Sequence, residues 1–134
     1  MALDIGKKKY SDDSIWVEYE GVRLKIGRAQ STDFLSATES LERPHKRKID
    51  KGTLSAKIRR DLNIRAIARA VLTDWDGVTD DGVAVPYSEE LGCKALSYDP
   101  DLLEFIIDTS IENSNFAVEV EEKIVKKSVK KIVG

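Results

Sequence analysis

The sequence predicts an α+β fold that is mainly α, with an N-terminal β-hairpin followed by a small helical domain. Apolar and polar side chains alternate over residues 14–26, as they do in half-buried strands. After Gly27 the apolar period changes to that of helices, and helix-capping residues recur over 31–112. A chain of 134 residues suits a single domain, which we place at 14–115, with its hairpin at 14–27.

Two alternating runs make up the predicted hairpin. Its apolar positions are Ile15, Val17, Tyr19, Val22, Leu24 and Ile26. Glu20-Gly21 lies between the runs, where a two-residue turn requires positive φ angles. Because an isolated hairpin is only marginally stable in water, we expect it to pack on helices or to pair its free edge. Residues 1–13, with three consecutive lysines, predict a flexible N-terminal arm.

The first predicted helix begins at Ser31 or Thr32 and ends before Pro44. The clearest predicted helix comes next, and its apolar stripe continues to Trp75 in the following loop. The stripe consists of Ile64, Ile67, Ala68, Val71, Leu72 and Trp75. An earlier stripe of Leu54, Ile58 and Leu62 is offset around Asn63, where we expect a kink or a break.

The segment 74–87 is the most distinctive loop of the sequence, rich in acids and turn-forming residues. Asp81-Gly82 predicts a very small hairpin that ends at Pro86. Ser88 predicts the cap of a short helix, and Asp99 with Pro100 predicts the start of a strongly apolar one. That last helix is expected to be central to the core.

The C-terminal segment 116–134 fits two structures. Phe116, Val118 and Val120 alternate as in a strand, whereas residues from Val120 to Ile132 also lie on one side of a helix. Its glutamates precede its lysines, which is the order that complements a helix macrodipole. A C-terminal helix that orders on a partner is therefore the favoured interpretation.

Composition narrows the classes of function. Lys and Arg number 22 and Asp and Glu 24, so the chain lacks the basic excess that is typical of nucleic-acid binders. No apolar run approaches the roughly 20 residues that cross a bilayer. The chain has one cysteine, Cys93, and one histidine, His45, which are too few Cys and His side chains for a typical zinc site and disfavour a nucleophilic dyad. We expect a cytoplasmic, non-enzymatic protein with no cofactor, no metal, no nucleic acid and no membrane contact.

Asp74 and Asp76 suggest two metal-dependent alternatives. The Asp-Trp-Asp-Gly run resembles the nucleophile motif of haloacid-dehalogenase-type phosphatases, but that chemistry needs a parallel strand, and the preceding residues have helical period. A calcium loop would need a glutamate eleven residues further on, where Val85 or Tyr87 stands instead. A structured turn anchored by Trp75 and Tyr87 is the favoured interpretation.

Basic side chains are the candidate partner-binding residues. Arg43, Lys46, Arg47 and Lys48 surround Pro44 and predict either a solvated loop or a docking patch for an acidic partner. Arg65 and Arg69, on the polar side of the long helix, complete the candidate set. A hairpin edge, this basic segment and the C-terminal helix together predict binding to other protein chains, including self-association.

From Trp16 to Phe116 the chain resembles the small tail assembly chaperones of long-tailed bacteriophages and their prophage relatives. The resemblance rests on the loop between two helical parts and on Asn115-Phe116. The loop residues are Trp75, Gly77, Val78, Asp81, Gly82, Pro86, Tyr87 and Ser88.

The resemblance implies a non-catalytic protein that binds the tape-measure protein and recruits tail-tube subunits. Such a chaperone is expected in the host cytoplasm and not in the mature virion. The alternative is a structural virion component, such as a head-tail connector or a tail-terminator subunit.

Overall fold

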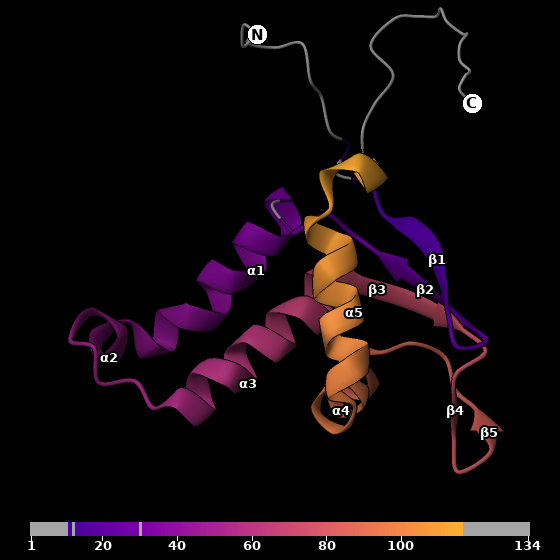
Figure 1. The fold of residues 1–134 in the computed structure, drawn as a ribbon. Helices are drawn as coiled ribbons and strands as arrows, with labels where there is room; N and C mark the ends of the chain where they lie inside the picture. The colour runs from indigo at the N-terminus through magenta and orange to yellow at the C-terminus, as the bar shows by residue number, and fades with distance from the viewer. Residues whose placement is uncertain (1–10, 12, 30, 117–134) are drawn as a thin grey trace, which may run out of the picture.

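The computed structural model describes residues 11, 13–29 and 31–116 (Figure 1). The predicted fold class is confirmed, since an N-terminal hairpin is followed by a mainly helical domain. In chain order the strands are β1 (Ile15–Tyr19), β2 (Val22–Ile26), β3 (Leu72–Asp76), β4 (Thr79–Asp80) and β5 (Val83–Ala84). The helices are α1 (Thr32–Glu42), α2 (Lys46–Asp50), α3 (Ala56–Ala66), α4 (Glu89–Tyr98) and α5 (Pro100–Ile111). The predicted flexible arm and C-terminal helix lie almost entirely outside the described residues.

The hairpin forms as the alternation predicts. β1 pairs with β2 in antiparallel register, with Ile15 opposite Ile26 and Tyr19 opposite Val22. Glu20 and Gly21 both have positive φ, 46° and 85°, as a two-residue turn of this twist requires. One face of the hairpin is therefore apolar and the other polar, which allows one face to cover a core while the other meets water.

A third strand, β3, corrects the predicted helix. Helix α3 ends at Ala66, a π-helical turn covers Ile67–Val71, and Leu72–Asp76 then pairs antiparallel with β2. The pairing shifts between Lys25 and Ile26, so Leu24 faces Trp75 while Ile26 faces Leu72. This bulge lets two side chains three positions apart point to the same face, and that spacing is the one a helix would show. The edge of β2 is paired with β3, one of the two arrangements expected of the hairpin, and is therefore not free to bind another chain.

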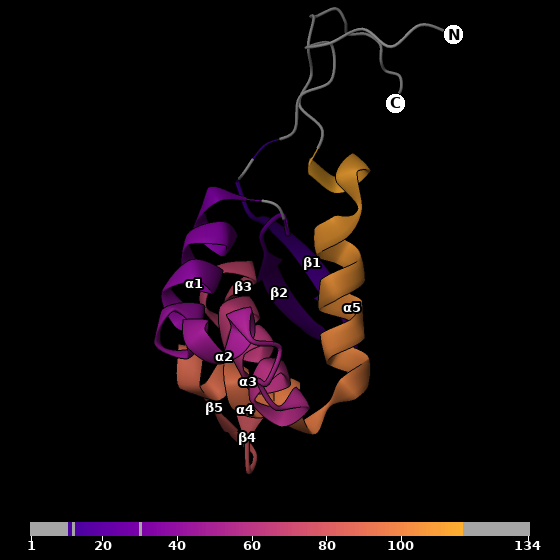
Figure 2. The same ribbon diagram turned by 90° about the vertical axis from the view of Figure 1, so that its left-hand side faces the viewer.

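The core lies between the inner face of this sheet and the helices. Buried Leu24, Leu72 and Trp75 from the sheet meet Ile67 from the π-helical turn and Ile106 from α5. α5 runs beside the sheet (Figure 2), while α1, α2 and α3 extend away from it as a lobe (Figure 1). We expected Trp75, Ile67, Val71 and Phe105 to be structural. The first three are buried, with exposures of 7%, 4% and 2%, and Phe105 is half-buried against the core.

The kink or break expected around Asn63 is absent, since α3 continues to Ala66. Other predicted boundaries are confirmed. Ser31, Ser88 and Asp99 each accept a backbone hydrogen bond as N-caps of α1, α4 and α5, and Pro100 begins α5. Asp81 and Gly82 close the small β4–β5 hairpin. In the described part of the chain, no helix is long and apolar enough to cross a membrane.

Candidate partner-binding groove

A groove of about 550 Å³ opens between α1, α2 and α3. α1 and α3 are antiparallel neighbours that pack together near the sheet, and a short 3-10 turn at Arg43–His45 leads into α2 at the far end. Proline at the start of that turn prevents α1 from continuing as a regular helix. The connection therefore goes around the end of the groove and leaves it open.

The floor of the groove is apolar and its rim is mainly cationic, with Glu42 as the one acidic residue of the lining. Leu54 is buried, at 7% exposure, and the half-buried Leu41, Ile49 and Leu62 complete the apolar floor. Arg59 and Arg60, both exposed on α3, supply the charge. Among the described residues neither arginine forms an ion pair, whereas the nearby Lys57 is held by Asp61 at 3.1 Å. An apolar floor with cationic edges suits an amphipathic helix that carries acidic residues.

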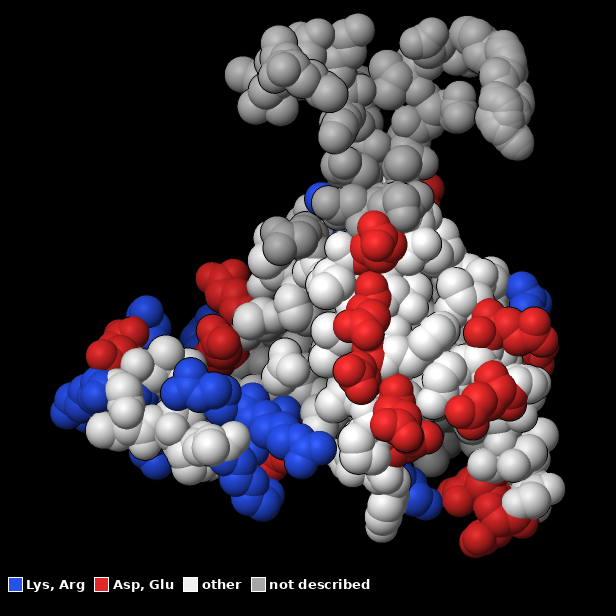
Figure 3. All heavy atoms as spheres, viewed as in Figure 1, with Lys and Arg blue, Asp and Glu red and all other residues white. Residues whose placement is uncertain are grey.

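The groove lies in a strongly basic part of the molecule. Residues 43–60, which we call the basic arm, contain eight Lys or Arg residues and one acidic residue. Figure 3 shows these blue side chains gathered over α2 and α3, at the left of the molecule. The net positive charge of the basic arm attracts acidic partners and speeds their encounter.

Four of the six sequence-predicted binding residues lie in the basic arm. Arg43 and Lys46 line a second hollow of about 190 Å³ beside the groove. Arg47 and Lys48 are exposed on α2. Lys46 also contacts Asp50 at 3.6 Å, one turn along the same helix. The structure thus brings these four residues together next to the groove without placing any of them in its lining.

The other two predicted residues, Arg65 and Arg69, lie away from the groove. Both hydrogen-bond to Glu89 at the start of α4, with distances of 2.9 Å from Arg65 and 3.0 Å from Arg69. Hydrogen bonding from Arg69 lowers the pKa of Glu89 despite partial burial of the carboxylate. This ion-pair cluster ties α4 to the end of α3 and to the π-helical turn.

Arg59 and Arg60 were missed as site residues by the sequence analysis. The signal was present in the offset between the stripe at Leu54, Ile58 and Leu62 and the later stripe of the core. An apolar stripe that does not line up with the core stripe points to a different surface. Its neighbouring arginines therefore border that surface.

The distinctive loop has a structural role at the residues that anchor it. Trp75 donates through Nε1 to the Val85 carbonyl at 2.9 Å, and Tyr87 packs edge-on against Trp75 with ring centroids 4.8 Å apart. Tyr87 also donates to the carbonyl of Ala68, and burial raises its pKa, so the phenol remains a donor. Gly77, Asp81 and Gly82 have positive φ at the turns of this loop.

Two smaller features complete the loop. Val78 accepts a backbone hydrogen bond from Val85 at 3.1 Å, across the base of the β4–β5 hairpin. Pro86, which has no N–H to donate, follows the hairpin in an exposed position. The loop motif thus holds the hairpin against the core.

Asp74 and Asp76 lie on a strand, β3, and not on the predicted helix, but the sheet around them is antiparallel, whereas the phosphatase motif requires a parallel strand. Among the described residues, no group of three or more His, Cys, Asp or Glu side chains is placed to hold a metal ion. Cys93 is half-buried, and that burial raises the pKa of its thiol. A high thiol pKa disfavours the nucleophilic thiolate form.

Comparison with known proteins gives one result. The family model described as YdaY prophage protein matches residues 29–127, which include α1 to α5 and the groove. No curated protein matches the chain, and no solved structure matches it.

Proposed function

The chain belongs to the YdaY prophage protein family, and on that premise we propose that it is a non-catalytic tail assembly chaperone. In this role it binds the tape-measure protein in the host cytoplasm, keeps it soluble and recruits tail-tube subunits. The protein leaves the assembly before the virion is mature.

The observation that carries the proposal is the groove between α1, α2 and α3. Its floor of Leu41, Ile49 and Leu54 removes apolar side chains of a bound helix from water. Its arginine rim pairs with acids on the helix edges and so favours one orientation over others. A long, largely helical client such as a tape-measure protein offers many helical segments of this kind.

Co-expression with the tape-measure protein of the same prophage tests the proposal. We expect the tape-measure protein to become soluble and to co-purify with this chain. The double substitution Arg59→Gln/Arg60→Gln should remove most of the co-purification, because it neutralises the groove rim. The matched control Arg23→Gln/Lys94→Gln neutralises two exposed cations away from the groove and should keep it. A tape-measure protein that stays insoluble beside the wild-type chain would contradict the proposal.

A structural virion component is the second candidate, and one observation favours it. Most cationic side chains gather over α2 and α3, whereas α5 carries a line of acidic ones (Figure 3), an arrangement that suits repeated contacts between copies. Mass spectrometry of purified intact particles separates the two candidates. A connector or terminator would be present in fixed copy number, whereas a chaperone would be absent.

A further inference from the structure

The exposed face of α5 carries acidic residues at helical spacing. Asp101, Glu104 and Asp108, which we call the acidic ridge, are all exposed. Residues three and seven positions apart lie on one side of a helix, so the three carboxylates form a line. Figure 3 shows this red line along the middle of the molecule, separate from the basic arm at the left. Residues 98–112 contain five acidic residues and no Lys or Arg.

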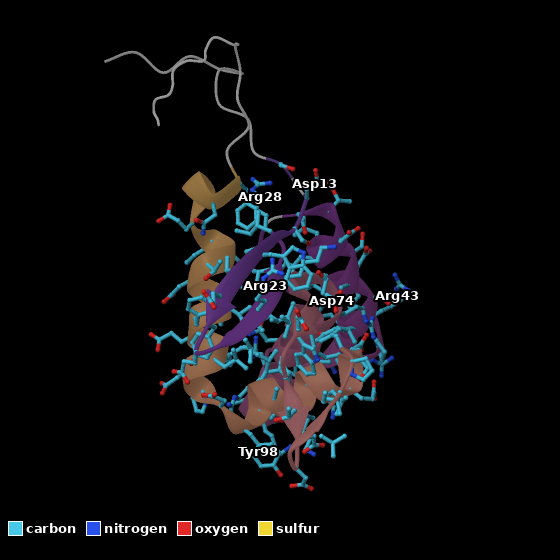
Figure 4. The ribbon with its side chains drawn as sticks, turned by 90° about the vertical axis from the view of Figure 1, so that its right-hand side faces the viewer. Asp13, Arg23, Arg28, Arg43, Asp74 and Tyr98 are labelled. Atoms are coloured by element: carbon cyan, nitrogen blue, oxygen red, sulfur yellow. The ribbon has the colours of Figure 1, made fainter. Side chains whose placement is uncertain are left out.

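Exposed apolar side chains stand at both ends of the ridge. Tyr98, at the end of α4, is 80% exposed, and Ile111, at the end of α5, is 58% exposed. Figure 4 shows Tyr98 at the lower end of the molecule, remote from Arg43 at the edge of the basic arm. Tyr98 does not belong to the hydrophobic core cluster of the described residues. Exposed tyrosines next to charged residues are frequent anchors of protein interfaces.

The chain thus carries on its own surface an acidic helix that complements the arginines of the groove, with one exposed apolar side chain at each end. We propose that, without a client, the groove and basic arm of one copy bind the acidic ridge of a second copy. The contact joins two different surfaces, so each copy can use its groove for one neighbour and its ridge for another. It goes beyond the tape-measure interaction, because both components belong to this chain.

Charge complementarity selects a second copy as the occupant. Arg59 and Arg60 form no ion pair with a described residue, and no Lys or Arg of the described part pairs with Asp101, Glu104 or Asp108. Contact between copies brings these unpaired groups of opposite sign together. A nucleic acid would satisfy the cations as well, but Tyr98 and Ile111 beside the ridge offer the groove floor apolar contacts that a phosphate backbone lacks.

Reciprocal charge reversal tests the contact on the full-length chain. One variant is Arg59→Glu/Arg60→Glu and the other is Glu104→Lys/Asp108→Lys. Sedimentation velocity at low salt should show self-association of the wild type that weakens as salt is added, because exposed charges are screened. Each variant alone should self-associate at least about tenfold more weakly, because like charges now face each other. An equimolar mixture of the two should recover association, because the reversed surfaces complement each other.

The controls separate folding from contact. Asp13→Lys/Asp76→Lys makes the same change in net charge as the ridge variant, outside both surfaces, and should associate like the wild type. Tyr98→Ala should weaken association while leaving the melting temperature unchanged, since Tyr98 lies outside the core cluster. Circular dichroism and thermal melts establish that each variant is folded.

Several outcomes would overturn the proposal. A wild type that is monomeric at every salt concentration would do so, and so would folded reversed variants that stay monomeric when mixed. Binding of a DNA duplex by both the wild type and the ridge variant, with no self-association, would assign the basic arm to nucleic acid instead. Self-association is measured without any tail protein, so its failure would leave the tape-measure proposal standing.

Discussion

Tyr87 occupies the space that a side chain at position 92 would need. A Cβ atom added to Gly92 would lie 2.9 Å from both Cε1 and Cζ of Tyr87, closer than such contacts occur in proteins. The absence of a side chain at Gly92 lets the phenol reach the Ala68 carbonyl across the helix. A glycine in a helix is normally a cost to stability, and here it admits the ring that anchors the loop.

Gly92→Ala should therefore destabilise the protein by about 1 to 3 kcal/mol, because the methyl group displaces Tyr87. The sign of the change in unfolding free energy is diagnostic, since glycine to alanine at an unhindered helical position stabilises a protein by about 1 kcal/mol. Chemical denaturation measures the free energy of unfolding. Adding Tyr87→Phe to Gly92→Ala should recover part of the loss by removing the hydroxyl, and two strictly additive effects would argue against the clash.

The two tryptophans of the sheet offer a matched pair. Trp75 is 7% exposed on the inner face, whereas Trp16 is 39% exposed on the outer face, where the Arg23 guanidinium stacks 4.8 Å from its ring. Figure 4 looks onto this outer face, on which Arg23 and Asp74 are labelled. Trp75→Ala should cost about 3 to 5 kcal/mol. Trp16→Ala should cost about 1 kcal/mol at most, in line with an exposed cation–π contact, and equal costs would contradict the assigned faces.

At the scale of the element, β3 shows where sequence patterns stop being informative. The hairpin β1–β2 and the starts of α1, α4 and α5 are local structures, because their turn and capping residues lie within a few positions of one another. The pairing of β3 depends on β2, and α1, α2 and α3 lie between the two strands in the sequence. The bulge beside Ile26 gives Leu72 and Trp75 a helical spacing, so the sequence alone favoured the wrong element.

The candidate site was predictable to a similar degree. The basic run around Pro44 is visible in the sequence, and it does lie beside the groove. The groove itself depends on how α1 and α3 diverge, which no local pattern contains. In the sequence, Arg65 and Arg69 resemble Arg59 and Arg60. Their roles differ only because α4 packs beside Arg65 and Arg69 and brings Glu89 into ion pairs with both.

The Glu89 cluster should make stability depend on pH. Its hydrogen bond from Arg69 lowers the pKa of Glu89 in the folded state below the ordinary value of 4.5. Stabilisation by this group is therefore complete above pH 4.5 and is lost as the pH falls through the folded-state pKa. Because the three side chains are 27% to 38% exposed, solvent screening limits the contribution to about 1 kcal/mol or less.

Glu89→Gln should accordingly be less stable than the wild type near neutral pH and equal to it in acid. Urea denaturation across this range measures the difference. Glu90→Gln is the control, because Glu90 is 78% exposed and contacts Arg65 at 3.5 Å only. A constant difference between Glu89→Gln and the wild type at all pH values would show that packing, not charge, accounts for the effect.

At the scale of the whole molecule, a shared groove makes the two proposed interactions mutually exclusive. A peptide from the tape-measure protein and the acidic ridge of a second copy would compete for the same floor and the same arginines. By linkage, each interaction weakens the other by an equal factor. The chain would exchange contacts with itself for contacts with its client.

Peptide titration measures this competition. We expect a helical tape-measure peptide to dissociate self-associated chain, and we expect its apparent affinity to fall as the protein concentration rises. Fluorescence anisotropy of a labelled peptide reports both effects. The ridge variant Glu104→Lys/Asp108→Lys keeps the groove and should bind the peptide with an affinity independent of protein concentration. A peptide that binds without dissociating the wild type would place the two interactions on different surfaces.

The late position of β3 in the chain also bears on the order of folding. The β1–β2 hairpin closes through a two-residue turn on a timescale of about microseconds. β3 can join β2 only after the segment that contains α1, α2 and α3 has folded back onto the sheet. The Gly27 N–H donates to the Val71 carbonyl at 2.7 Å, where this segment leaves and rejoins the sheet. Closing so long a loop costs entropy before any contact compensates it. Until β3 leaves the ribosome, β2 presents an unpaired edge, and a nascent chain is most exposed to mispairing with its neighbours during that interval.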